Sequence, residues 1–216
     1  MQNSRYPLAV SCERCGKKDI FFMQTLIDTA KDSNAEQKMF RGDYFTYQCP
    51  RCGHTQLYSF TCLYHDSKKK LLVGLADNEK DMEEMRLSLG GFYHRDELDT
   101  ALNEWLKTCT VRIVDTPEKM QEKVLIAHFD LDDRIVELAR RQVRMELEEV
   151  ESESFDLFFN SSEDGYGFTV LTKEGAERFV PVTENMYQNI LEQYSSRLET
   201  VVEKEIDAFW SEQFAG

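Results

Sequence analysis

In the first 75 residues, short runs of aromatic and β-branched residues alternate with polar turns, a pattern typical of β-strands. The pattern predicts strands at residues 19–28, 43–48, 55–64 and 71–75, after extended sequence that begins near Tyr6. The polar residues between the first two runs predict a loop or a short helix. This part of the chain is therefore expected to form a small β-sheet.

The middle of the chain has a different period, because its apolar residues repeat every three or four positions. Asn78 is expected to cap a helix that ends at the glycines 90–91, and a second helix is expected over residues 96–107. The β-branched run 110–114 predicts a strand between this helix and the next one.

Two further helix starts follow from residues that favour capping. Thr116 precedes Pro117, which is a hydroxyl cap followed by proline at the first helical position. Asp132 or Asp133 is expected to cap the next helix. Its apolar stripe consists of Val136, Ala139, Val143, Leu147 and Val150.

The pattern changes again after residue 154. Runs at 155–159 and 167–171 flank a glycine-containing turn and predict a β-hairpin. A proline in the run 178–182 predicts an edge strand. Thr183 is then expected to cap one long amphipathic helix over residues 184–212, with an apolar stripe that includes Val202 and Phe209.

These elements predict an α+β protein with a zinc-ribbon-like antiparallel β core, helical elaboration, and a C-terminal hairpin with a long helix. Three parts are expected: a ribbon-like module at 1–75, a helical part of the same domain at 76–150, and the C-terminal unit at 151–216. The distal half of the long helix needs a surface to cover it. Both the helix 136–150 and a second copy of the chain are candidates.

Charge is distributed unevenly along the chain. Residues 1–75 carry a net charge of +4, and the remainder carries −18, for a total of −14. This balance disfavours binding of the whole protein to nucleic acid or an anionic membrane. No run of 18 apolar residues and no secretory signal is evident, so a cytoplasmic protein without membrane association is expected.

Two Cys-x-x-Cys-Gly motifs carry the clearest chemistry. They are separated by 33 residues and supply Cys12, Cys15, Cys49 and Cys52. A Cys-x-x-Cys turn directs two thiolates at one point, and two such turns complete a tetrahedral four-sulfur site. We therefore expect one structural Zn²⁺ per chain, with a closed coordination shell that leaves no position for water.

Other interpretations of the cysteines remain open at this point. The four thiols could be buried without metal, hold iron, or carry out redox chemistry. A redox role is disfavoured because thioredoxin-type motifs place a single Cys-x-x-Cys at a helix N-terminus after a strand, whereas both motifs here lie between strands.

The motif Cys49-Pro50-Arg51-Cys52 resembles the paired cysteine motifs of the bacterial and archaeal CpXC-domain proteins. The first motif lacks the proline. The resemblance extends over the residues 63–66 and 131–134, and so covers about residues 8–150. It implies a zinc-binding site at the cysteines and does not by itself imply a cellular role.

Several weaker candidates have simpler structural explanations. His54 and His65 are expected at the surface or behind the ligands, because four cysteines suffice for zinc. Cys62 and Cys109 are expected to be buried apolar residues. The acidic cluster Asp130, Asp132 and Asp133 fits a helix N-terminus better than a cation site, with Arg134 forming a local ion pair.

The sequence thus favours a non-catalytic interaction or regulatory protein, with a protein partner or a homodimer. Nucleic-acid binding through the basic ribbon half is the first alternative. The four basic residues near the motifs, Arg14, Lys17, Lys18 and Arg51, also favour thiolates electrostatically, which is the preferred explanation of their position. An enzyme with a pocket between the ribbon and the helices is the second alternative, although no catalytic constellation is recognisable.

Overall fold

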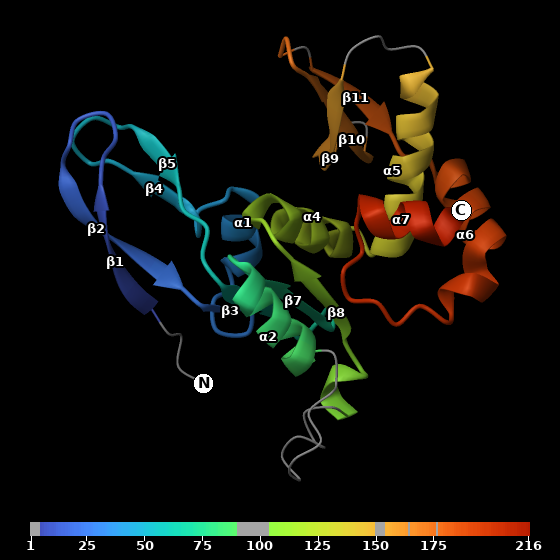
Figure 1. Cartoon of the computed structure of the whole chain (residues 1–216), viewed down its shortest axis with the longest axis horizontal. Coiled ribbons are helices and arrows are strands. Elements are labelled where there is room, and N and C mark those ends of the chain that lie inside the picture. The colour runs from blue at the N-terminus through green and yellow to red at the C-terminus, as the bar shows by residue number, and fades with distance from the viewer. Residues whose placement is uncertain (1–4, 90–103, 150–153, 164, 176) are drawn as a thin grey trace. The chain divides into compact units, whose positions relative to one another are not determined.

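The computed structural model describes residues 5–89, 104–149, 154–163, 165–175 and 177–216 (Figure 1). The chain forms two compact units, one that ends at Val124 and one that begins at Leu125. The predicted division after residue 75 stays a prediction, and the one predicted after residue 150 falls outside the described residues. The α+β class is confirmed, since helices and antiparallel strands occur in both units.

The first unit contains a four-stranded sheet in the order β3-β6-β7-β8. The outer pairs are parallel and the central pair is antiparallel. The strands are β3 (Leu26–Asp28), β6 (Cys62–Asp66), β7 (Leu71–Leu75) and β8 (Thr110–Val114). All five residues of β7 are buried, as expected for a central strand covered on both faces.

Three helices accompany this sheet: α1 (Ala35–Phe40), α2 (Glu79–Leu89) and α4 (Pro117–His128). The α2 helix buries Met85 against Ile113 of β8. Two expected caps are confirmed, because the side chain of Asn78 accepts the N–H of Asp81 and that of Thr116 accepts the N–H of Lys119. Of the expected helix 96–107, only residues 104–107 are described, and 104–106 are helical.

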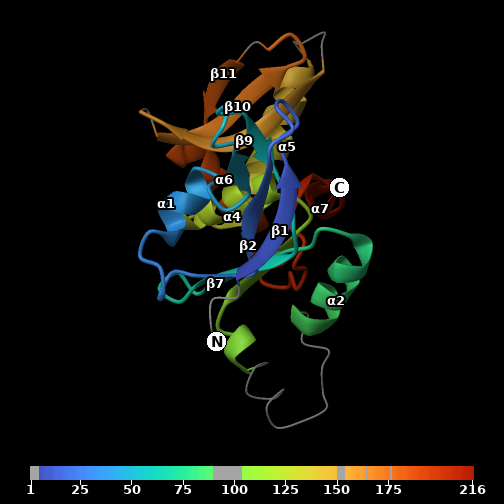
Figure 2. The same cartoon turned by 90° about the vertical axis from the view of Figure 1, so that its left-hand side faces the viewer.

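Two antiparallel hairpins form an arm that extends away from the four-stranded sheet (Figure 1). Figure 2 shows the arm from its own side, with β1 and β2 in front. The hairpins consist of β1 (Arg5–Ser11) with β2 (Lys18–Gln24) and of β4 (Thr46–Gln48) with β5 (Thr55–Leu57). Aromatic side chains fill the space between them, with Phe21 stacked on Tyr58 at 5.4 Å between ring centroids.

The arm explains why two expected strands are divided. The run 19–28 breaks at Thr25, because its first part pairs with β1 in the arm and its second part with β6 in the sheet. The run 55–64 breaks for the same reason, since β5 pairs with β4 and β6 pairs within the sheet. The alternation of apolar and polar residues is continuous through each run, but the strand with which the run pairs changes partway along it.

The second unit packs three helices with the antiparallel sheet β11-β10-β9. Its strands are β9 (Phe155–Ser162), β10 (Gly165–Thr172) and β11 (Glu177–Pro181). Its helices are α5 (Asp133–Glu148), α6 (Glu184–Leu198) and α7 (Ala208–Ala215). The side chain of Thr183 accepts the N–H of Met186, which confirms the predicted cap, and β11 is an edge strand as its proline predicted.

The prediction of one long helix over residues 184–212 is wrong. The first helix ends at Leu198, and a second begins after Asp207, whose side chain accepts the N–H of Trp210 at 3.0 Å. The β-branched run at residues 200–202 favours helix weakly, and the turn brings α7 back against α5. Two predicted stripe residues are consequently exposed, Val202 to 76% and Phe209 to 66%.

A matched set of substitutions tests the two-helix arrangement. Val202→Glu combined with Phe209→Glu is expected to change the free energy of unfolding by less than about 0.5 kcal/mol, since both side chains are solvated. Trp210→Ala removes a buried indole and is expected to cost about 3–5 kcal/mol. Calorimetry of the three chains provides the comparison. Loss of the cooperative melt in the double variant would mean that Val202 and Phe209 belong to one buried helical stripe.

Candidate metal centre

The two Cys-x-x-Cys turns have the same backbone geometry. In the first, the N–H of Gly16 donates to the carbonyl of Cys12 at 2.8 Å, and the N–H of Cys12 donates to the carbonyl of Lys17 at 2.9 Å. The same two bonds recur in the second turn, where Cys49 takes the place of Cys12. These turns lie at the ends of the β1–β2 and β4–β5 hairpins, so their cysteines are presented side by side.

Each turn depends on a glycine in the left-handed region. Gly16 has φ of +68° and Gly53 has φ of +70°. A Cβ atom at either position would meet no atom within 4 Å, so backbone conformation rather than space requires glycine. The glycine after each second cysteine, which is part of the sequence motif, is thereby explained.

The four cysteine Sγ atoms lie within 4.8 Å of one another. Two of these separations cross between the turns, at 3.6 Å for Cys12 to Cys52 and 3.6 Å for Cys15 to Cys49. A disulfide requires about 2.05 Å between sulfurs. A tetrahedral zinc with Zn–S distances of about 2.3 Å places its sulfurs about 3.8 Å apart. The cysteines therefore fit a tetrahedral metal ion.

The electrostatics of the cluster also favour a cation. Burial disfavours the Cys49 thiolate, but hydrogen bonds from the backbone amides of Arg51 and Cys52 and from neighbouring thiols lower the pKa of Cys49 to about 6. The amide of His54 favours the Cys52 thiolate, yet burial and the adjacent sulfurs raise the pKa of Cys52 to about 11. Ionising one sulfur thus opposes ionising the next, and a divalent cation would remove this repulsion.

Gln56 on β5 joins the two turns without being a ligand. Its side-chain oxygen accepts the N–H of Glu13 at 3.1 Å, and its amide nitrogen donates to the carbonyl of Ser11 at 3.4 Å. Only 8% of this residue is exposed. Gln56 is not among the site residues predicted from the sequence, although it is a polar residue on the strand face that also carries Tyr58 and Phe60.

Tyr47 supports the same region from β4. Its hydroxyl donates to the carboxylate of Asp19 on β2 at 3.2 Å. Burial, together with hydrogen bonding to Cys49 and Asp19, raises the pKa of Tyr47. A neutral phenol behind Cys49 therefore links the two hairpins next to the sulfur cluster.

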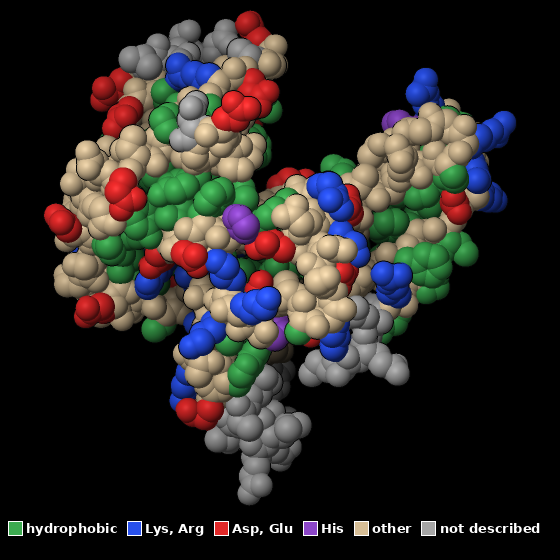
Figure 3. Space-filling model, turned by 180° about the vertical axis from the view of Figure 1, so that it is seen from behind, with side chains coloured by type: hydrophobic (Ala, Val, Ile, Leu, Met, Phe, Trp, Pro, Cys, Tyr) green, Lys and Arg blue, Asp and Glu red, His purple; other side chains and the backbone are tan. Residues whose placement is uncertain are grey.

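Basic side chains surround the free end of the arm. Figure 3, in which the arm is seen on the right, shows Lys and Arg gathered at this end. They are Arg14, Lys17, Lys18 and Arg51. Within the described ranges, none of the four has an ion-pair partner within 4 Å. A zinc ion with four thiolates has a formal charge of −2, which these cations would balance.

The weaker candidates lie elsewhere or act structurally. His65 lies on β6, where its Nδ1 is 3.5 Å from the carboxylate of Asp28. Cys62 is buried, and burial raises its pKa to about 12. Cys109 is partly buried against a small cluster with Leu72 and Leu106.

The acidic cluster before α5 forms a helix start. Asp132 accepts the N–H of Arg134 and forms an ion pair with its guanidinium at 2.6 Å. Among the described residues, the four cysteines are the only group of three or more His, Cys, Asp or Glu whose ligand atoms converge as a metal would require.

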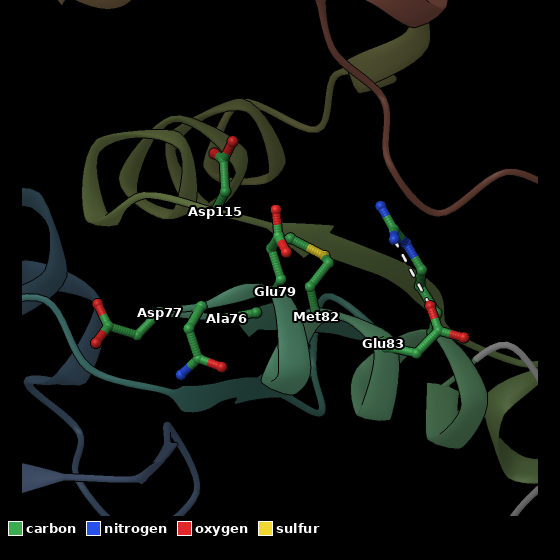
Figure 4. A pocket seen from close by; sticks show the side chains of 8 residues that line it. Ala76, Asp77, Glu79, Met82, Glu83 and Asp115 are labelled. Atoms are coloured by element: carbon green, nitrogen blue, oxygen red, sulfur yellow. Dashed lines mark ion pairs between the residues drawn. The ribbon is translucent and has the colours of Figure 1, made fainter.

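A pocket of about 600 Å³ lies at the carboxyl ends of the parallel strands β7 and β8 (Figure 4). Its lining consists of Ala76, Asp77, Asn78, Glu79, Met82, Glu83, Arg86 and Asp115. The guanidinium of Arg86 pairs with Glu83 at 3.8 Å. The lining contains no histidine, cysteine or serine, and its ionisable groups are four carboxylates and one guanidinium.

Paired cysteine turns on two β-hairpins define a zinc-ribbon-like protein with a site that can hold a metal ion. Residues 10–140 match the model of the CpXC family, described as CpXC protein. The match spans more than half of the chain, so the chain belongs to the CpXC family. No curated protein and no solved structure gives a match. No helix in the described ranges has the length and apolar character needed to cross a membrane.

The role of Gln56 can be tested against its neighbour. Gln56→Leu leaves the N–H of Glu13 and the carbonyl of Ser11 without their partner, and is expected to lower the free energy of unfolding of the arm by about 1–3 kcal/mol. Leu57→Ala is the control, because that side chain is 68% exposed and should contribute less than about 0.5 kcal/mol. Urea unfolding of metal-loaded protein measures both. Equal losses would contradict the bridging role.

Proposed function

We propose that Cys12, Cys15, Cys49 and Cys52 hold one zinc ion and that this ion is structural. The observation that carries the proposal is the convergence of four sulfurs from two matching turns, all within 4.8 Å. Thiolates suit zinc among the common cellular cations, and four of them fill its tetrahedral shell. With no open position, the ion would not activate water.

The arm itself gives the ion a structural task. Its strands β4 and β5 are three residues long, and an isolated two-stranded hairpin is marginally stable at best. A metal bound to both turns would cross-link two such hairpins at their free ends. The aromatic contacts near Phe21 and the bonds of Gln56 then hold the hairpins together below the ion.

We further propose that the protein is a non-catalytic interaction or regulatory protein with a protein partner. A projecting arm with a saturated metal site presents surface rather than chemistry. The enzyme alternative has weaker support, because the described pocket at β7 and β8 offers carboxylates but no histidine, cysteine or serine among its lining residues.

Nucleic-acid binding is the second candidate, and the observation that favours it is the four cations at the end of the arm, which have no ion-pair partner among the described residues. This support is reduced because the same cations would offset the negative charge of a four-thiolate zinc site. The net charge of −14 on the chain reduces it further. Titration with mixed single-stranded and double-stranded oligonucleotides at rising salt separates the candidates. Phosphate contacts predict affinity that falls steeply with salt.

The zinc proposal is tested by two cysteine substitutions. Cys49→Ala opens the four-sulfur shell, so the purified chain is expected to lose its zinc and the folding free energy that the ion supplies to the arm. Cys109→Ala removes a partly buried thiol outside the cluster and is expected to retain one zinc and cost less than about 1 kcal/mol. Elemental analysis and thermal melting in reducing buffer report the difference. Zinc contents that stay equal would refute the assignment of Cys49 as a ligand.

A further inference from the structure

The β1–β2 hairpin has two edges, and the pairing pattern shows which backbone groups point outward. The N–H of Cys12 donates to the carbonyl of Lys17, so these two residues form a hydrogen-bonded pair. In an antiparallel ladder such pairs alternate with pairs whose N–H and C=O groups point away from the partner strand. On β2, Lys18, Ile20, Phe22 and Gln24 therefore direct their backbone groups to the outer edge.

The edge of β1 is closed at two places. Pro7 occupies one of its outward-facing positions, opposite Phe22, and has no N–H to donate to an added strand. At the other end, the carbonyl of Ser11 accepts the side chain of Gln56. A further strand therefore cannot form a continuous ladder along β1, because Pro7 offers no N–H and the carbonyl of Ser11 is already bonded to Gln56.

The edge of β2 is open. The N–H of Ile20 is bonded to the side chain of the neighbouring Asp19 at 2.9 Å. Beyond that, the backbone groups of Lys18, Ile20 and Phe22 that point outward have no hydrogen-bond partner within the described residues. The two apolar side chains on this edge are exposed as well, Ile20 to 54% and Phe22 to 58%. Proteins usually protect such an edge, and among these residues only Lys18 and the Asp19 side chain on the Ile20 N–H do so.

Ile20 and Phe22 lie on the same face of the hairpin as Pro7 and Ala9, which are their register partners and are also exposed. The face that carries Phe21 is turned toward the aromatic contacts of the arm. The hairpin therefore combines an unpaired edge with a continuous apolar outer face. A partner that adds a strand to β2 would satisfy both features.

We propose that this partner is a second copy of the chain, with the two β2 strands paired antiparallel about Phe21. In this register Ile20 lies opposite Phe22 of the partner subunit, and the symmetry repeats the contact. Gln24, which would face Lys18 of the partner subunit, is buried, so the ladder ends before Lys18 and no like charges meet across it. The two-fold axis passes through Phe21, so both copies contribute the same β2 edge to the contact, as an isologous dimer requires. The proposal names the partner of the interaction role proposed above and rests on that role.

Charge and size fit the same arrangement. Antiparallel pairing directs the two basic arm ends away from each other, which keeps their like charges apart. The two facing pairs of Ile20 and Phe22 allow up to about four backbone hydrogen bonds. A ladder this short gives a weak complex, so the dimer is expected to be reversible and concentration-dependent.

Sedimentation velocity of the zinc-loaded full chain, from about 1 μM to about 500 μM, tests the proposal. The wild-type chain is expected to convert from monomer to dimer within this range. Phe22→Glu and Ile20→Lys are each expected to weaken the dimer at least about tenfold, because each places a charge against an apolar residue. Phe209→Glu, at a position 66% exposed in the second unit, is the matched control and should leave the dimer unchanged.

Mixing the two variants tests the register itself. In a mixed dimer the substituted positions 22 and 20 face each other with opposite charge, and the other pair stays apolar, so association is expected to return. A wild-type chain that stays monomeric throughout, a dimer that tolerates Phe22→Glu, or a mixture that fails to associate would each overturn the proposal. Elemental analysis of the same samples keeps this result separate from the zinc proposal. If the zinc proposal is wrong, the samples contain no zinc, whether the chain sediments as a monomer or as a dimer.

Discussion

The mutual repulsion of four closely spaced sulfurs is the constraint on which the arm depends. Two hairpins bring four thiols within 4.8 Å of one another. Hydrogen bonds lower the pKa of Cys49 to about 6, while burial and the neighbouring sulfurs raise that of Cys52 to about 11, so ionising one of these sulfurs opposes ionising the other. A bound divalent cation would reverse this situation, because the same sulfurs would then attract the ion and join the two turns.

The surrounding residues are arranged around that constraint. Gly16 and Gly53 allow the turns, Gln56 joins one turn to the other, and Tyr47 connects β4 to Asp19 on β2. With one end fixed by these contacts, the β1–β2 hairpin can present an exposed edge without a larger sheet beneath it. The proposed zinc site and the proposed strand addition would thus share one small element.

Much of this architecture could be predicted from the sequence, and the failures have local causes. The cysteine motifs specified the cluster because Cys-x-x-Cys-Gly determines its own turn. The caps at Asn78 and Thr183 were predictable for the same reason. Tertiary context decided the rest. The run 19–28 has one period but pairs with two different strands. After Leu198 the apolar residues keep a helical spacing, but the helix ends there and a new one begins after Asp207. Gln56 was missed because its partners lie more than 40 residues away.

X-ray absorption at the zinc edge of the full chain, purified under reducing conditions, tests the central claim most directly. The account predicts one zinc per chain with a first shell of four sulfurs at about 2.3 Å and no lighter ligand. A shell that contains nitrogen or oxygen, or a folded arm that carries no zinc at all, would contradict it.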